Sequence, residues 1–183
     1  MKSIDKASVN KYAINYANTV RDWAISNIYS DFTLQVRLDW SDKRRCSRGG
    51  MYADGPGINM AMKQAYNNCK GETYRFMEYA SFDADKNIGG FYSIDPYHKL
   101  EAILLHEIAH ALQFFSYGKN GVRCKPHGPV FKNFYKRLRC EFLNHKLPEQ
   151  ATLKKDYDEY VSKLNRGVEH VLKDILNRAA ASK

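Results

Sequence analysis

The chain of 183 residues lacks the features that mark membrane, secreted and cysteine-stapled proteins. It has no apolar run of about 18 residues and no signal-peptide pattern, which argues against a membrane span or secretion. Its four cysteines lie far apart and no two form a CxxC pair, so a zinc site built from paired cysteines is excluded. We therefore expect a reduced intracellular protein, located in the cytoplasm or associated with the nucleoid or nucleus.

The chain also lacks linkers, low-complexity stretches and internal repeats. A hydrophobic content of 44% is sufficient for one core in a chain of this length. Positive charge is in excess, with a formal net charge of +9. The basic cluster of Lys43, Arg44, Arg45 and Arg48 predicts contact with nucleic acid or an acidic partner, with a solvated surface as the alternative.

The most informative motif is a complete HExxH, His106-Glu107-Ile108-Ala109-His110. Residues four apart lie on the same face of an α-helix, so His106 and His110 can direct two imidazole nitrogens at one zinc ion. Glu107 lies about 100° further round the helix and would reach a zinc-bound water. Zinc lowers the pKa of such a water, and Glu107 could act as general base and later as acid. A buried helix with two hydrogen-bonded histidines is the alternative interpretation.

The residues around the motif predict a capped, largely buried helix. Asp95 and Pro96 are typical of a helix start, and Gly118 is typical of a helix end. The apolar residues between them recur at helical spacing: Leu100, Ile103, Leu104, Ile108, Ala111, Leu112 and Phe115. Two buried histidines and a glutamate need polar partners, and a metal ion with its water would provide them.

A catalytic zinc site has three protein ligands and one open position, so a third ligand is needed. The candidates are His98, His127, His145, His170 and a carboxylate at or after Glu141. The metzincin pattern is excluded, because Ser116 occupies the position at which that pattern needs its third histidine.

His127 begins the segment His127-Gly128-Pro129-Val130-Phe131, ahead of a new amphipathic run. An HExxH followed, after a short connection, by HGxxF at the head of another helix resembles the SprT-like (Spartan-type) zinc metallopeptidases. In that family the later histidine is the third zinc ligand, which corresponds to His127. Many SprT-like proteins also carry a C-terminal zinc ribbon of paired CxxC motifs, and this chain lacks it.

The resemblance implies an α+β fold, a zincin-like minimal metalloprotease domain over residues 1–148. Such a domain has an N-terminal helix, a small antiparallel sheet, the HExxH helix and a helix that follows the third ligand. The apolar spacing of residues 7–30 predicts the first helix, and the alternation over residues 32–40 predicts a half-buried strand.

Further strands are predicted between these elements and the HExxH helix. Residues 48–52 and 58–60 flank turn residues at 54–57, which is typical of a hairpin. Residues 73–82 form another candidate strand. In zincins an edge strand commonly receives the substrate peptide by β-augmentation.

Residues 149–183 are predicted to form a C-terminal amphipathic helix. Its apolar positions repeat in steps of three and four: Tyr157, Val161, Leu164, Val168, Val171 and Ile175. We expect this helix to pack on the catalytic domain of a monomer, with self-association as the alternative.

Together these features predict a zinc-dependent endopeptidase that hydrolyses protein substrates and contacts DNA through its basic loops. One Zn²⁺ per chain would be held by His106, His110 and His127, with Glu107 as the catalytic residue. The alternative is a metal-containing DNA- or protein-binding module without protease activity. Glu107 argues against that alternative, because a structural zinc site needs a fourth ligand and no base.

Overall fold

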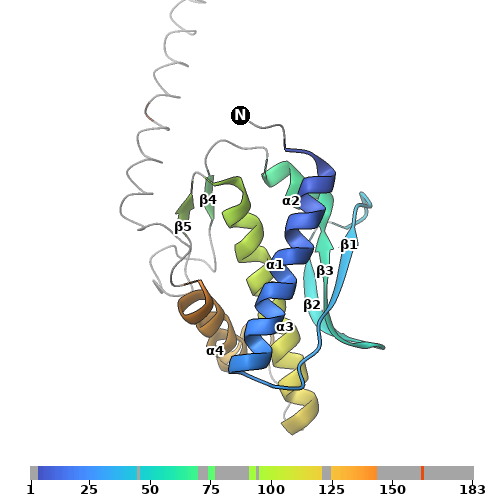
Figure 1. Ribbon diagram of the computed structural model, residues 1–183, viewed down its shortest axis with the longest axis vertical. Coiled ribbons are helices and arrows are strands. Elements are labelled where there is room, and N and C mark those ends of the chain that lie inside the picture. The colour runs from blue at the N-terminus through green and yellow to red at the C-terminus, as the bar shows by residue number, and fades with distance from the viewer. Residues whose placement is uncertain are drawn as a thin grey trace, which may run out of the picture.

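The protein combines helices with a small three-stranded sheet that lies at one side of α1 and α3 in the view of Figure 1, which confirms the mixed α and β class. The computed structural model describes residues 4–44, 46–69, 74–76, 91–93, 95–120, 125–143 and 162. Its elements are α1 (Lys6–Asn27), β1 (Gln35–Asp39), β2 (Arg48–Tyr52), β3 (Gly55–Ala61), α2 (Met62–Asn68), β4 (Tyr74–Phe76), β5 (Phe91–Ser93), α3 (Pro96–Asn120), α4 (Pro129–Arg137) and the π-helix η1 (Leu138–Phe142).

The N-terminal helix α1 matches the helix predicted for residues 7–30, although it ends at Asn27. Its first turn is capped by Asp5, whose carboxylate accepts hydrogen bonds at 2.8 Å from the backbone N–H and the hydroxyl of Ser8. These hydrogen bonds lower the pKa of Asp5. One face of the helix is buried in the core through Val9, Ala13, Tyr16, Ala17, Val20 and Ala24.

The three-stranded sheet has the order β1-β3-β2. β2 pairs with β3 in an antiparallel hairpin, as predicted, but β1 pairs with β3 in parallel. The prediction of an antiparallel sheet was therefore wrong for β1, because apolar alternation identifies a strand but not the direction of its neighbour. The hairpin turn lies at Ala53 and Asp54, earlier than predicted, and Gly55 follows it with φ of 118°.

The long helix α3 passes between the sheet and α4 and carries the HExxH motif (Figure 1). It was predicted to end at Gly118 but continues to Asn120. A Cβ at Gly118 would lie 3.9 Å from the Cε of Met51, so β2 packs against this last turn. Such tertiary contact can outweigh the cost of about 1 kcal/mol for a glycine inside a helix.

A partly buried polar contact fastens α1 to α3. Tyr12 donates its phenolic proton to Glu101, which lies on the turn of α3 before His106. The ring of Tyr12 also stacks on that of Tyr97, with centroids 4.2 Å apart. Burial and the hydrogen bond to Glu101 raise the pKa of Tyr12, so the phenol stays protonated. The start of the motif helix is thereby held against the core.

β2 approaches α3 most closely at Gly49. A Cβ at Gly49 would lie 1.9 Å from the backbone oxygen of Glu107 and 2.9 Å from the Cβ of His110. Any larger residue at this position would place its Cβ in collision with the backbone of α3, so the approach requires glycine. The neighbouring Gly50 is different, because the atoms nearest to its Cβ belong to Phe114 at 3.9 Å.

Several predicted elements fall wholly or partly outside the described residues. Of the candidate strand at 73–82, β4 is described and pairs with β5 in an antiparallel ladder. The predicted C-terminal helix at 149–183, and with it the domain boundary after residue 148, lies outside the described residues except for Ser162.

No helix in the described part of the chain is long and apolar enough to cross a bilayer.

Replacing Gly49 by Ala should force β2 away from α3 and lower the free energy of unfolding by about 1–3 kcal/mol, the usual cost of overpacking. Gly50→Ala is the matched control in the same strand, and it should change stability by less than about 0.5 kcal/mol. Urea denaturation of the metal-free proteins measures both values. Equal effects of the two substitutions would contradict the close approach at Gly49.

Candidate metal centre and active site

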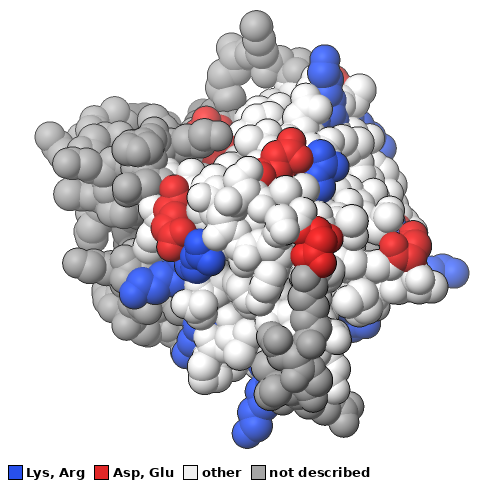
Figure 2. All heavy atoms as spheres, turned by 60° about the horizontal axis from the view of Figure 1, so that its bottom comes forward, with Lys and Arg blue, Asp and Glu red and all other residues white. Residues whose placement is uncertain are grey.

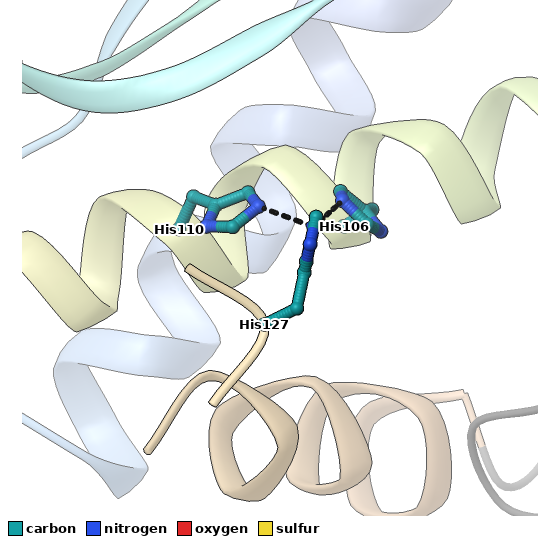
Figure 3. Close-up of side chains that lie close together, drawn as sticks. All are labelled: His106, His110 and His127. Atoms are coloured by element: carbon teal, nitrogen blue, oxygen red, sulfur yellow. Dashed lines mark hydrogen bonds between the residues drawn. The ribbon is translucent and has the colours of Figure 1, made fainter. Parts of the chain in front are cut away.

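Three histidines from two segments converge beside α3 (Figure 3). His106 and His110 extend from adjacent turns of α3, and His127 reaches them from the turn before α4. The Nε2 atom of His127 lies 3.0 Å from the Nε2 atoms of both His106 and His110. One ligand atom from each histidine lies within 4.8 Å of the other two, so the three side chains form a potential metal site.

The other candidate third ligands lie elsewhere or are not described. His98 lies 3.7 Å from Asp95 at the start of α3. Glu141 is in η1 and forms an ion pair with Arg137 at 3.1 Å. His145 and His170 are outside the described residues.

The donor set fits a divalent cation. A ring nitrogen carries either one proton or one lone pair, so the Nε2 of His127 cannot donate equally to both neighbours. A metal ion can instead accept lone pairs from all three rings. Imidazole nitrogens about 2.0–2.1 Å from a tetrahedral zinc would lie roughly 3.4 Å from one another, which is near the 3.0 Å separation found here. Zinc therefore suits the size and chemistry of the site.

Phe131 forms the apolar support of the cluster. Its ring centroid lies 4.9 Å from that of His106, 4.2 Å from His110 and 4.8 Å from His127. Phe131 is fully buried in the first turns of α4. The HGxxF segment therefore supplies both a histidine and the ring on which all three histidines pack.

His127 is presented by a tight turn. The carbonyl oxygen of Lys125 accepts the backbone N–H of Gly128 at 3.0 Å, and His127 has φ of 57°. Proline in the second position and a positive φ in the third are typical of a type II turn, and Pro126 occupies the second position here. A side chain larger than glycine is unfavourable at positive φ and costs of order 1–3 kcal/mol. The histidine is thus held in a strained backbone conformation.

Glu107 lies between the histidines and β2. Its side chain is buried, and its Oε2 accepts the backbone N–H of Gly49 at 2.6 Å. This short hydrogen bond fixes the orientation of the side chain. The histidines and Glu107 line one pocket of about 420 Å³, whose other lining residues are Ser47, Arg48, Gly49, Phe114 and Pro126.

The predicted basic cluster is only partly available on the surface. Arg44 is ion-paired with Asp39, its Nε lying 2.7 Å from the carboxylate. Hydrogen bonds from Ser41 and Arg44 lower the pKa of Asp39 to about 2. Lys43 and Arg48 are exposed, and Arg45 is outside the described residues.

Two residues of the site were not identified from the sequence. Gly49 acts through its backbone N–H, for which the only sequence signal is a glycine where the strand must approach a helix. Gln113 hydrogen-bonds to His110, and its signal is a polar side chain on the same helix face as His106 and His110.

Three histidines that could bind a metal ion, together with the family match below, suggest a metallopeptidase-like domain. The family model of the SprT-like family matches residues 91–153, which include the HExxH motif and His127. The match confirms the resemblance noted from these motifs. No curated protein and no solved structure matches the chain.

The strain at His127 can be measured with two substitutions that both remove the imidazole. In metal-free protein, His127→Gly should be more stable than His127→Ala by about 1 kcal/mol, because glycine adopts positive φ without a steric cost. Thermal or urea unfolding in the presence of a chelator gives the difference. If His127→Ala were the more stable of the two, the turn would not hold this residue at positive φ.

Proposed function

We propose that this protein is a zinc-dependent endopeptidase that hydrolyses protein substrates. The observation that carries the proposal is the position of Glu107, a buried carboxylate beside three converging imidazoles in one pocket. The match to the SprT-like family over residues 91–153 supports the same chemistry.

In this mechanism His106, His110 and His127 would hold the metal through ring nitrogens. When bound, zinc supplies a Lewis acid for the scissile carbonyl and lowers the pKa of a water. Glu107 takes the proton from the attacking water and later delivers it to the leaving amine. The N–H of Gly49 holds the carboxylate in position for both transfers, so its orientation does not change between them.

A purely structural metal site is less well supported. Structural zinc sites have four protein ligands, whereas the group found among the described residues consists of three histidines. His127 is exposed and lies at a pocket, which leaves room for a water or substrate at the metal. A binding module that keeps the metal only for stability would also have no use for the carboxylate of Glu107.

The substrate would lie along β2, which among the described strands pairs only with β3. The N–H of Gly49 points to Glu107 and away from β3. In an antiparallel ladder alternate residues direct their backbone groups to the same side, so the backbone groups of Met51 also face away from β3. An extended peptide that paired with this edge would pass the pocket by β-augmentation.

An apolar surface lies beside this edge. Phe114 lines the pocket and is 37% exposed, and Met51 on β2 is 48% exposed. The ring of Phe114 lies one helical turn beyond His110 on α3. A substrate side chain close to the scissile bond would contact this ring, so an unfolded polypeptide with an apolar residue there is the preferred substrate.

Contact with DNA stays a prediction. Lys43 and Arg48 are exposed, whereas Arg44 is engaged by Asp39. Figure 2 shows basic and acidic side chains interspersed on the face that it presents, without one large patch of a single sign. Of these two exposed residues, Arg48 lines the pocket and is the candidate for a phosphate contact next to it.

The metal and the base can be separated by substitution. The purified protein should hold about one zinc per chain, and His110→Ala should lose most of it, because two nitrogen ligands bind weakly. Glu107→Gln should keep the zinc and the fold but lose at least about 100-fold in peptidase activity, a typical contribution of general base catalysis. Metal analysis and cleavage of an unfolded protein measure the two effects.

Glu141→Gln is the matched control, since Glu141 is a glutamate on the surface of η1. It should keep both zinc and activity. Unchanged cleavage by Glu107→Gln would remove the proposed mechanism, and full zinc occupancy in His110→Ala would remove the proposed metal site.

The apolar contact gives a prediction about substrate choice. Phe114→Ala should lower kcat/KM roughly tenfold for peptides with a large apolar residue beside the scissile bond, which is about 1.4 kcal/mol of lost contact. Peptides with a small polar residue there should change little. Ile14→Ala removes another exposed apolar side chain, on α1, and should leave both substrates unaffected. An equal loss on both peptides in Phe114→Ala would argue against the contact.

A further inference from the structure

We propose that Gln113 is a positioning residue that fixes the tautomer of His110 and holds the turn that carries His127. This inference rests on the proposed metal site, but it concerns the hydrogen bonds of the protein and can be tested without metal. One side-chain amide would then control two of the three metal ligands.

Gln113 lies on α3 and is only 2% exposed. Its Nε2 donates to the backbone oxygen of Lys125 at 2.9 Å, and its Oε1 lies 3.3 Å from the Nδ1 of His110. A buried amide costs roughly 1–3 kcal/mol if it is not hydrogen-bonded, so both contacts matter for stability. The two contacts connect the HExxH helix directly to the segment before α4.

The contact with Lys125 determines which way the amide faces. A backbone carbonyl oxygen can only accept, so the NH₂ group of Gln113 must face Lys125. The Oε1 atom then faces the Nδ1 of His110, and that nitrogen must carry a proton in order to donate.

A neutral imidazole with a proton on Nδ1 has its lone pair on Nε2. The Nε2 of His110 is the atom that lies 3.0 Å from the Nε2 of His127, on the side where a metal would bind. Gln113 therefore selects the tautomer that is ready to ligate a metal, before any metal arrives. Hydrogen bonds of this kind also raise the basicity of a ligand.

The same amide stabilises the strained turn. The oxygen of Lys125 accepts from both Gln113, at 2.9 Å, and the N–H of Gly128, at 3.0 Å. Both lone pairs of this carbonyl are thus used, one to close the turn and one to attach it to α3. Because His127 lies inside this turn with φ of 57°, Gln113 fixes its distance from the helix.

Two substitutions separate the two roles. Gln113→Glu keeps an acceptor for the Nδ1 proton of His110 but cannot donate to Lys125 when it is ionised. Gln113→Met has a similar length and makes neither hydrogen bond. Gln64→Met, at an exposed position on α2, is the control for the glutamine-to-methionine change.

The measurements are the zinc dissociation constant from chelator competition, the tautomer of His110 from nitrogen NMR of metal-free protein, and exchange of the Gly128 amide. Gln113→Met should weaken zinc binding about 10–100-fold, the usual effect of removing such a partner. It should also remove the preference of His110 for the Nδ1-protonated form. Gln113→Glu should keep that preference, while its Gly128 amide should exchange at least about fivefold faster, because the turn opens more easily.

The proposal would be overturned by a folded Gln113→Met variant that binds zinc within about twofold of the parent and keeps the tautomer of His110. If Gln113→Met does not fold, Gln113→Glu decides the matter, and unchanged exchange of its Gly128 amide would equally overturn the proposal. A parent protein that shows no peptidase activity would contradict the proposed function alone, since the tautomer and exchange measurements need no catalysis.

Discussion

The convergence of three imidazole nitrogens beside α3 is the constraint on which the site depends. Nitrogens 3.0 Å apart bring lone pairs together, and one proton cannot satisfy two acceptors equally. A cation that shares all three lone pairs turns this unfavourable arrangement into a binding site. The surrounding residues hold the three imidazole rings close together.

The neighbouring elements fix the positions of the three histidine rings and of Glu107. Phe131 packs against all three imidazole rings, and the turn at Pro126 directs His127 towards α3. Gly49 lets β2 approach so closely that its backbone N–H holds Glu107. The strain at His127, of order 1–3 kcal/mol, is the kind of cost that proteins retain at functional positions.

In the proposed mechanism, the same approach of β2 would connect the metal site with the substrate. Because Gly49 uses its N–H for Glu107, β2 and the carboxylate of Glu107 are fixed relative to each other. A peptide paired with β2 would therefore be placed relative to the base as well as to the histidines. This link explains why a strand that carries no catalytic side chain is part of the proposed active site.

The features that could be predicted from the sequence are those that depend on local sequence patterns. The helical spacing of His106 and His110, the apolar face of α1 and the β2–β3 hairpin depend on residues near one another in the chain. His127 was assigned as the third ligand from the family resemblance. Its position in the sequence alone does not distinguish it from the other histidines. The parallel pairing of β1 and the continuation of α3 beyond Gly118 depend on contacts between distant segments, which no local pattern records.

The backbone of Gly49 and the amide of Gln113 escaped prediction for a related reason. Gly49 acts through a group that every residue possesses, and only the closeness of β2 to α3 makes it specific. Gln113 reaches the oxygen of Lys125, which lies twelve residues further along the chain, so its role appears only when α3 and the turn are placed together.

X-ray absorption at the zinc edge of the purified protein tests the central claim most directly. The account predicts three imidazole nitrogens at about 2.0–2.1 Å and one light oxygen ligand, in a four-coordinate site. Sulfur at about 2.3 Å, or four nitrogen or sulfur ligands from the protein, would show a different or a closed site and would contradict the account.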